Sequence, residues 1–324
     1  MTKAIRIYEI GGPDVLKWED VDVGEPGTGE VRLKHTAIGL NYIEVYQRTG
    51  LYKITDFPAT IGSEAGGVIE AVGDGVTDFK VGDRVMYAMN IGAYSEERTM
   101  STDKLVAVPD GIDDQVAGGM MLQGMTAYYL LHKTYAVQPG DTILLYAAAG
   151  GVGLIMSQWA KHLGASVIGC VGSEEKAELV KANGCDHTIL YRDESVSERV
   201  KEITNGEGVP AVYDSIGKAT FMDSLDCLSP LGIMASFGNA TGPVDPFPLG
   251  ILAAKGSLYV TRPTLATHTA TRERLEECAG ALIGVVEGGQ VKVAVNQTYA
   301  LADAAQAHID LEARKTSGSS VLLP

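Results

Sequence analysis

A turn of small residues near the middle of the chain places the strongest constraint on the fold. The apolar run DTILLYA leads into it, and GLIMSQWAKHLGA follows with the spacing of an amphipathic helix. The stretch AAAGGVG matches a G-x-G-x-x-G turn with alanine in the first position, and such a turn lets a pyrophosphate approach the backbone at a helix N-terminus. An ordinary tight turn without a ligand is the alternative. We expect a dinucleotide to contact Ala148, Gly150, Gly151, Val152 and Gly153.

The region after this turn alternates between predicted strands and helices. Five further apolar runs follow, SVIGCVG, HTIL, AVYDSIG, GIMASFGN and GSLYVTRP, and helix-like stretches separate most of them. Six strands that alternate with helices indicate a parallel, doubly wound Rossmann sheet, in which ligands bind at the carboxyl ends of the strands. Further cofactor contacts are therefore expected after the third, fifth and sixth strands, at Tyr191, Phe237, Gly238, Asn239 and Val260.

The end of the second strand indicates which dinucleotide binds. NAD sites usually carry an acidic residue there to bind the ribose 2′-hydroxyl, whereas this chain has Gly172 followed by Ser173. Ser173 can donate a hydrogen bond to a 2′-phosphate and Lys176 can pair with its charge, so the pattern predicts NADPH. Glu174 and Glu175 would oppose the phosphate if they lie close to it, and a solvated surface lysine is the alternative for Lys176.

The first 110 residues show a different pattern. EVRLKHTAIGLN alternates apolar and polar residues with the period of a half-buried strand, and glycine and aspartate turns separate further short apolar runs. This pattern predicts a small antiparallel barrel or sandwich. A helical period begins near Gly111, and one long amphipathic helix follows Pro263.

Composition argues against several classes of protein. Lys and Arg number 26 against 41 Asp and Glu, and the resulting net charge of −15 argues against a general nucleic-acid binder. The four cysteines, at 170, 185, 227 and 278, form no CxxC pair, so we expect buried free thiols rather than disulfides or zinc. The sequence contains neither an apolar run of 18 residues nor a secretory signal at its start, which predicts a cytoplasmic protein without a membrane span.

Taken together, the motifs resemble the medium-chain dehydrogenase/reductase superfamily, and within it the zinc-free, zeta-crystallin-like quinone oxidoreductases. The resemblance runs from GGPDVL through GGVGLIMSQWAKHLGA, YDSIG, SFGN and GSLYVTRPTL to GSSVLLP. It implies an α/β fold with two domains. One is a GroES-like, mainly antiparallel β-barrel catalytic domain, residues 1–124, to which residues 266–324 return, and the other is a Rossmann NADPH-binding domain, residues 125–265. It also implies NADPH as the cofactor and a small-molecule quinone as the substrate.

The resemblance further implies roles for individual side chains. Asn41, Tyr46 and Tyr52 are expected to line the place where the nicotinamide meets its acceptor, with ordinary loop packing as the alternative for the tyrosines. Alcohol dehydrogenases carry zinc ligands where this chain has Asn41 and Ser63, and neither is a good zinc ligand, so no catalytic metal is expected. The acceptor should then need little activation. Arg314 is expected to close over the cofactor, with an ordinary surface arginine as the alternative.

Three functions remain open on this fold, because a fold does not fix a function. The first is NADPH-dependent reduction of quinones by hydride or single-electron transfer. The second is NADPH-dependent reduction of enones or alkenals. The third is non-catalytic binding of NADPH by a structural or stress protein.

The last predicted strand also indicates an oligomeric state. SLYVT contains neither the lysine nor the proline that usually protects a free sheet edge, and it comes last in the strand series. Two copies of such an edge can pair antiparallel about a two-fold axis, so we expect a homodimer. The alternative is that the helix after Thr269 covers this edge.

Overall fold

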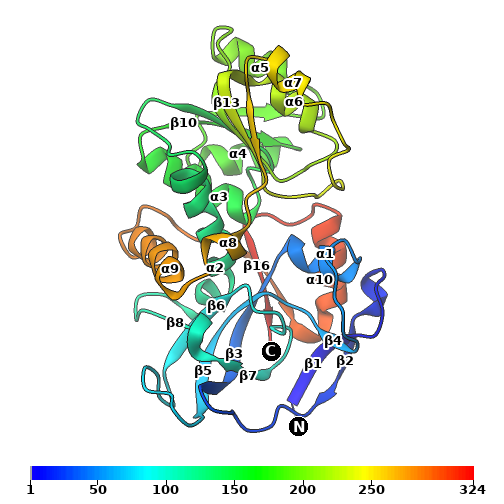
Figure 1. Cartoon of the computed structure of the whole chain (residues 1–324), viewed down its shortest axis with the longest axis vertical. Helices are drawn as coiled ribbons and strands as arrows, with labels where there is room; N and C mark the ends of the chain where they lie inside the picture. Colours follow the sequence, from blue (N-terminus) through cyan, green and yellow to red (C-terminus); the bar gives the residue numbers. More distant parts are fainter. Residues whose placement is uncertain (1) are drawn as a thin grey trace. The chain divides into compact units, whose positions relative to one another are not determined.

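A computed structural model describes residues 2–324, and the chain divides into two units (Figure 1). Unit 1 holds residues up to 123 together with 269–280 and 293–324, and unit 2 holds residues 124–268 and 281–292. Residues 124, 266–268 and 281–292, which were predicted to lie in the first domain, group with unit 2. In the last of these segments, Leu282 packs directly against Gly124 and Lys292 exchanges two hydrogen bonds with Gln158.

The six predicted strands of unit 2 form one parallel sheet with the order β11-β10-β9-β12-β13-β14. The order reverses at β9, and open α/β sheets bind ligands beside the carboxyl end of a strand at such a reversal. β14 pairs only with β13 within the described chain, and its Tyr259 is 60% exposed, so it is an edge strand. The strands are β9 (Thr142–Leu145), β10 (Ser166–Val171), β11 (His187–Leu190), β12 (Val209–Asp214), β13 (Leu228–Ser236) and β14 (Tyr259–Thr261).

Helices connect these strands, and all but the short helix at Gly250–Ala254 lie where the sequence predicts them. The strands contribute Leu144, Ile168, Val212 and Met234 to a shared apolar core, because parallel strands are covered on both faces. The helix α2 (Asp114–Tyr129) ends in a π-helical turn over Leu130–Thr134. The others are α3 (Gly151–His162), α4 (Glu174–Lys181), α5 (Val196–Ile203), α6 (Phe221–Asp226), α7 (Gly250–Ala254), α8 (Leu265–His268) and α9 (Arg272–Glu287).

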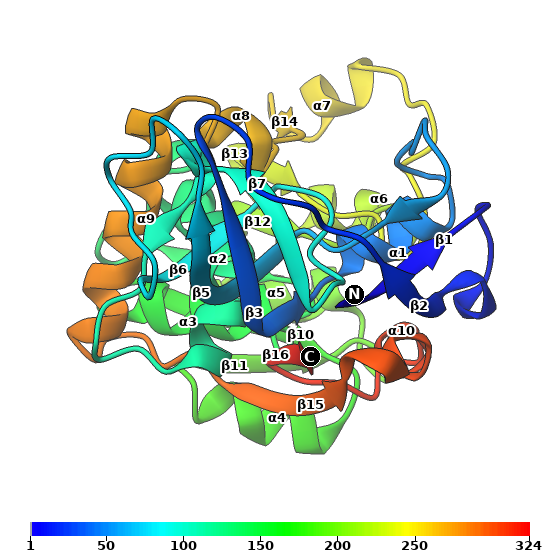
Figure 2. The same cartoon turned by 90° about the horizontal axis from the view of Figure 1, so that it is seen from below.

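Unit 1 is built around the long strand β3 (Glu30–Leu40). Its residues alternate as predicted, with Val31, Leu33, His35 and Ala37 buried. β3 pairs with three strands: β5 (Glu64–Val72), β7 (Glu97–Ser101) and the C-terminal β16 (Ser319–Leu323). Figure 1 shows β16 in red against the blue β3, and Figure 2 shows β7 beside it.

The seven-stranded sheet of unit 1 has the order β15-β16-β3-β5-β6-β8, with β7 paired to β3 off this path, and within residues 2–324 only its β15–β16 pair is parallel. No pairing joins β15 to β8 within residues 2–324, so the predicted closed barrel stays a prediction. The strand β15 was not predicted. The remaining elements are β15 (Val295–Ala300), β6 (Arg84–Ala88), β8 (Val106–Ala107), a sheet of β2 (Lys17–Val21), β1 (Thr2–Ile7) and β4 (Ala59–Thr60), and the helices α1 (Tyr42–Arg48) and α10 (Ala304–Glu312).

All four cysteines are free and buried, as predicted. Among residues 2–324, no helix combines the length and the apolar character needed to cross a membrane.

Candidate functional site

The glycine turn lies between β9 and α3, at the point where the strand order reverses. Gly150 is the N-cap of α3 without any side-chain capping bond, and the first turn of the helix contains no acidic residue. The first N–H groups of α3 are therefore left for an outside acceptor, and the helix dipole favours an anion. A Cβ atom on Gly150 would have only Ala147 O within 4 Å, at 3.3 Å, so the space beside this backbone is open. These features fit a pyrophosphate.

The third position of the turn has the opposite environment. A Cβ on Gly153 would lie 2.4 Å from Ala148 O and 2.5 Å from Ala147 O, so only glycine fits where α3 packs on the turn. Ala148, in the first position, is fully buried, and a Cβ on Gly169 would come within 2.9 Å of its methyl group. Alanine fits at position 148 because the neighbouring strand β10 has Gly169 at the point of contact.

The end of β10 presents a serine and a lysine rather than an acid. Ser173 Oγ accepts a hydrogen bond from Lys176 N at 3.3 Å and caps α4, and its own hydroxyl proton remains available as a donor. Ser173 is exposed and Lys176 is half-buried. A Cβ on Gly172 would lie 2.7 Å from Tyr191 Oη, so a larger residue there would displace another predicted contact. The arrangement fits a 2′-phosphate.

The loops after β12 and β13 are joined to each other. Phe237 N donates to Asp214 O at 2.8 Å, and a Cβ on Gly238 would lie 2.4 Å from a backbone carbonyl of the β12 loop. With its amide oriented to satisfy both groups, Asn239 donates to Gly238 O at 3.0 Å and accepts from Arg262 Nη2 at 3.2 Å. Three predicted contacts thus share one small framework, while Val260 lies in the neighbouring strand β14.

A buried carboxylate that the sequence analysis missed holds the β12 loop. Asp214 Oδ1 accepts from the backbone N–H groups of Ile216 and Gly217 at 2.7 and 3.1 Å. Asp214 Oδ2 accepts from the hydroxyls of Thr220 and Ser224 at 2.6 and 2.7 Å. The signal was present in the sequence, because an acid at the end of an apolar strand, as in YDSIG, requires buried partners.

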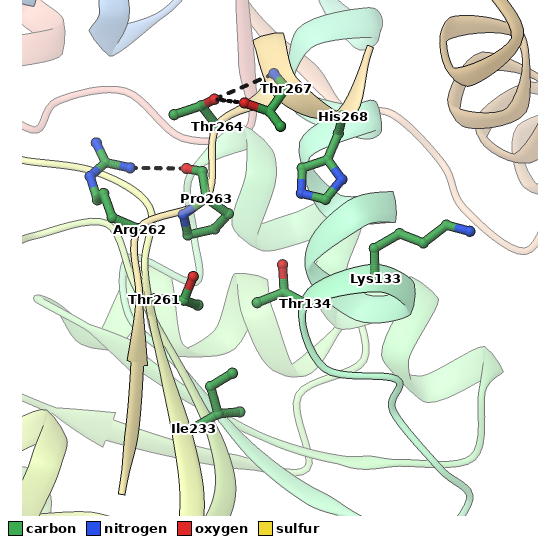
Figure 3. Close-up of a pocket in the computed structure, with 9 residues that line it drawn as sticks. All are labelled: Lys133, Thr134, Ile233, Thr261, Arg262, Pro263, Thr264, Thr267 and His268. Atoms are coloured by element: carbon green, nitrogen blue, oxygen red, sulfur yellow. Dashed lines mark hydrogen bonds between the residues drawn. The ribbon is translucent and has the colours of Figure 1, made fainter. Parts of the chain in front are cut away.

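A pocket of about 370 Å³ opens at the carboxyl end of β14 (Figure 3). In Figure 3, the charged ends of Arg262 and Lys133 extend away from its centre. Thr134 Oγ1 is buried there and makes no hydrogen bond within residues 2–324. None of the predicted cofactor residues lines this pocket. Its walls are Lys133, Thr134, Ile233, Thr261, Arg262, Pro263, Thr264, Thr267 and His268.

In unit 1, two of the three predicted catalytic residues lie together. The Tyr46 and Tyr52 rings meet edge-on with centroids 5.1 Å apart, and the Tyr42 ring lies 5.7 Å from that of Tyr46. Tyr46 is buried and Tyr52 is half-buried. Tyr46 lies in α1, Asn41 is the residue before this helix, and Tyr52 follows its end, so one short segment carries all three residues.

The Asn41 side chain is held by residues that the sequence analysis did not find. Its Nδ2 donates to Glu64 Oε1 at 2.7 Å, and its Oδ1 accepts from Gln123 Nε2 at 3.0 Å. Its backbone N–H donates to Glu44 Oε2 at 2.7 Å. Both glutamates are fully buried, and burial raises the pKa of Glu44 to about 8 and that of Glu64 to about 7. A glutamate in the strand run GSEAGG was the available signal for Glu64.

Arg314 lies in unit 1, whereas the other predicted cofactor residues lie in unit 2. It follows α10, is exposed, and adopts a left-handed backbone conformation with φ of 59°. Its contact with the cofactor stays a prediction.

Comparison with known proteins covers the whole chain. Residues 27–150 match the alcohol dehydrogenase GroES-like domain family, and residues 151–281 match the zinc-binding dehydrogenase family. The chain is 52% identical to the quinone oxidoreductase of Pseudomonas aeruginosa over the full length of both, and 48% identical to a 2-haloacrylate reductase of Burkholderia sp over 100% of this chain and 99% of that protein. The crystal structure of the Escherichia coli quinone oxidoreductase complexed with NADPH matches with a TM-score of 0.97 and 46% identity, covering 99% of this chain and 100% of that one.

Proposed function

The chain belongs to the quinone oxidoreductase family of medium-chain dehydrogenases/reductases, and we propose on this premise that it reduces a quinone with NADPH bound at the glycine turn of unit 2. One observation carries the proposal. The uncapped N-terminus of α3 has open space at Gly150, and the end of β10 offers Ser173 and Lys176 in place of an acid. When bound, NADPH supplies the reducing electrons as a hydride from its nicotinamide ring.

The residues of unit 2 would bind and orient this cofactor. The α3 N-terminus holds the pyrophosphate, and Ser173 and Lys176 hold the 2′-phosphate. The joined loops after β12 and β13 present Asn239 and the Phe237–Gly238 backbone to the nicotinamide carboxamide. Because these loops are tied together by backbone bonds, they position the ring without rearranging.

The residues of unit 1 would bind the acceptor. Quinones are flat and carry two carbonyl oxygens, so they call for aromatic cover and hydrogen-bond donors. Tyr46 and Tyr52 offer ring surface and phenol groups, and Asn41 offers an amide N–H. Asn41 and Ser63 are poor zinc ligands, so we propose that the reaction proceeds without a Lewis acid.

One relative favours a second candidate function. The 2-haloacrylate reductase is 48% identical to this chain over essentially its full length, and its name denotes an acceptor with an electron-poor C=C bond. An activated alkene can accept a hydride from the same nicotinamide, so an NADPH-dependent enone or alkenal reductase is the alternative.

A panel assay separates the functions that remain. Purified protein is mixed with NADPH and, in separate reactions, with quinones and with α,β-unsaturated carbonyl compounds, and the loss of NADPH absorbance is measured. Turnover with quinones supports the proposal, and turnover that favours the alkenes supports the second candidate. Binding of NADPH without turnover of any acceptor would instead indicate a non-catalytic role.

We further propose a homodimer in which two copies of the edge strand β14 pair antiparallel. Tyr259 is 60% exposed on that strand, which has a free edge within the described chain. Light scattering should give twice the chain mass of 34.2 kDa. The substitution Tyr259→Lys should shift the mass toward one chain, and Met222→Lys, at a 45% exposed site on α6, should not. A monomeric wild type, or a dimer that tolerates Tyr259→Lys, would overturn the proposal.

We propose a cytoplasmic location for the protein. Its four cysteines are free and buried, which is typical of proteins in reducing compartments. Cell fractionation with an antibody against the protein tests this location.

A further inference from the structure

A chain of buried hydrogen bonds in unit 1 holds the amide of Asn41. Ser319 Oγ donates to Gln123 Oε1 at 2.6 Å, Gln123 Nε2 donates to Asn41 Oδ1 at 3.0 Å, and Asn41 Nδ2 donates to Glu64 Oε1 at 2.7 Å. The backbone N–H of Leu122 completes this series of hydrogen bonds by donating to Glu64 Oε2 at 2.7 Å. The four side chains come from β16, α2, the start of α1 and β5, and all are buried.

The direction of these hydrogen bonds is determined by the ionised carboxylate of Glu64 and the backbone N–H of Leu122. A backbone N–H can only donate, and an ionised carboxylate can only accept. Asn41 must therefore turn its NH₂ group toward Glu64 and its oxygen toward Gln123. The carboxylate fits this place because residue 39 is glycine, since a Cβ there would lie 2.2 Å from Glu64 Oε1.

Asn41 is the least buried of these four side chains. Its exposed fraction is 7%, compared with 5% for Gln123, 1% for Ser319 and 0% for Glu64. The second N–H of its amide makes no hydrogen bond within residues 2–324. An N–H donor is the group that a quinone carbonyl oxygen requires as it gains negative charge during reduction.

We propose that Glu64 is a positioning residue for the reaction: together with Gln123 it fixes the Asn41 amide in one orientation, so that Asn41 offers an N–H donor to the acceptor oxygen. This inference rests on the proposed function, because it assigns the acceptor to Asn41. It adds the Glu64 carboxylate as a requirement for the reaction, beside the residues Asn41, Tyr46 and Tyr52 that would bind the acceptor. A carboxylate that never touches the acceptor determines whether Asn41 presents a donor or an acceptor.

The charge state of Glu64 gives the proposal a pH dependence. Burial raises its pKa to about 7, although the Asn41 and Leu122 N–H groups favour the ionised form. Beyond the effect of burial, the negative charge of Glu64 in turn raises the pKa values of Glu44, Tyr87 and Tyr94, which are the titratable groups coupled to it. A protonated Glu64 can donate to Asn41 Oδ1, which removes the constraint on the amide. Activity should therefore fall as the pH drops below about 7.

The substitution Glu64→Gln should reverse the direction of these hydrogen bonds, while each side chain still bonds to its neighbours in the series. The introduced amide must keep its oxygen on the Leu122 N–H, so its NH₂ group faces Asn41 and turns the Asn41 amide over. Gln123 then turns as well and donates to Ser319 Oγ, which can accept. The variant should therefore fold, while Asn41 presents its amide in the opposite orientation.

Glu44→Gln provides the matched control. Glu44 is also fully buried and also accepts a hydrogen bond from Asn41, but from its backbone N–H rather than from its side chain. Glu44→Gln also replaces a carboxylate oxygen by an amide nitrogen, at a position one turn of α1 beyond Asn41. The Asn41 side chain keeps its hydrogen bonds to Glu64 and Gln123. Gln123→Met is the second variant, because it removes only the donor to Asn41 Oδ1 and tests the proposal even if Glu64→Gln folds poorly.

The test measures the Asn41 amide directly and the reaction separately. In protein labelled with [¹⁵N]asparagine, the Asn41 NH₂ signal is assigned by its loss in Asn41→Ser. Hydrogen bonding to a buried carboxylate should separate its two proton shifts widely, and Glu64→Gln should collapse that separation while Glu44→Gln keeps it. Unchanged Asn41 shifts in Glu64→Gln would overturn the inference.

Steady-state kinetics with NADPH and 1,4-naphthoquinone form the second arm. Glu64→Gln should lower kcat by roughly a hundredfold, the loss expected when one donor to the developing charge is removed, leave KM for NADPH within about twofold, and abolish the acid limb near pH 7. Gln123→Met should lose about threefold, and Glu207→Gln, at an exposed carboxylate of unit 2, should match the wild type. A changed amide signal with unchanged kcat would overturn the inference. An inactive wild type would refute the proposed function instead, and the NMR arm would still decide whether Glu64 orients Asn41.

Discussion

The two units prepare their proposed binding groups by different means. Unit 2 presents backbone N–H groups at the start of α3, and their direction follows from the helix itself. Unit 1 presents the side-chain amide of Asn41, which bonds to Glu64 of β5 and Gln123 of α2, and Gln123 is in turn held by Ser319 of β16. A backbone site is therefore fixed by local packing, whereas a side-chain site is fixed by long-range hydrogen bonds and by the charge of one carboxylate. Substitutions should expose this difference.

The largest effect is expected from removing the close packing of the glycine turn. Gly153→Val places carbon atoms where a Cβ alone would lie 2.4 Å from a backbone oxygen, so α3 must move away from the turn. We expect NADPH affinity to fall by roughly a hundredfold or more and the free energy of unfolding to fall by about 1–3 kcal/mol. Fluorescence titration and urea denaturation measure the two quantities.

Gly284→Val is the matched control for this substitution. Gly284 also lies in a helix of unit 2, but a Cβ there has nothing within 4 Å. The control should bind NADPH as the wild type does. Equal NADPH affinity in Gly153→Val and Gly284→Val would show that the turn does not hold the cofactor.

The buried carboxylates of unit 1 should make stability depend on pH. Burial raises the Glu44 pKa from 4.5 to about 8, so the folded state keeps a proton that the unfolded state has lost between these values. Its stabilising contribution is complete below pH 4.5 and is lost as the pH rises to about 8. Glu44→Gln has no carboxyl group to ionise at this position. Between about pH 5 and 9 the free energy of unfolding of the wild type should therefore fall by about 2–4 kcal/mol relative to that of the variant.

Thermal and urea unfolding across this pH range check that difference. Glu207→Gln, which removes an exposed carboxylate of unit 2, should leave the pH dependence of the wild type unchanged. Parallel curves for the wild type and Glu44→Gln would mean that Glu44 is not held as a buried acid.

The smallest effect is expected at the 2′-phosphate. Lys176→Gln removes a half-buried cation from the first turn of α4, and one charge-assisted contact at this exposure corresponds to about tenfold in the Kd of NADPH. The Kd of NADH should not change, because NADH lacks the phosphate. Lys181→Gln, in the last turn of the same helix, should alter neither constant. An equal loss for both cofactors would assign Lys176 a structural role.

The features that could be predicted from the sequence are the locally determined ones, as in unit 2, whereas the long-range hydrogen bonds of unit 1 could not be predicted. The strands of unit 2 and the glycine turn are set by neighbours within a few residues, so apolar runs and small residues were enough to predict them. The edge position of β14 followed from its place in the series. The partners of Asn41 are 23 and 82 residues away, and no local pattern pairs Glu64 or Gln123 with it.

Two further misses have related causes. Within residues 2–324, β15 pairs only with β16 and alternates half-buried and exposed residues, so its sequence lacks the apolar run of a buried strand. Asp214 was quoted within a strand motif but not assigned a role, since its four donors become visible only when the loop is folded. In both cases tertiary pairing supplied what local sequence did not.

A single-turnover experiment tests the central claim most directly. The protein is saturated with NADPH, mixed rapidly with excess 1,4-naphthoquinone, and followed by the near-ultraviolet absorbance of the reduced nicotinamide. The account predicts that the bound NADPH is oxidised in one exponential phase whose rate saturates with quinone, and that NADH at the same concentration gives a much smaller amplitude because it binds more weakly. Oxidation no faster than that of NADPH and quinone in buffer alone would contradict it.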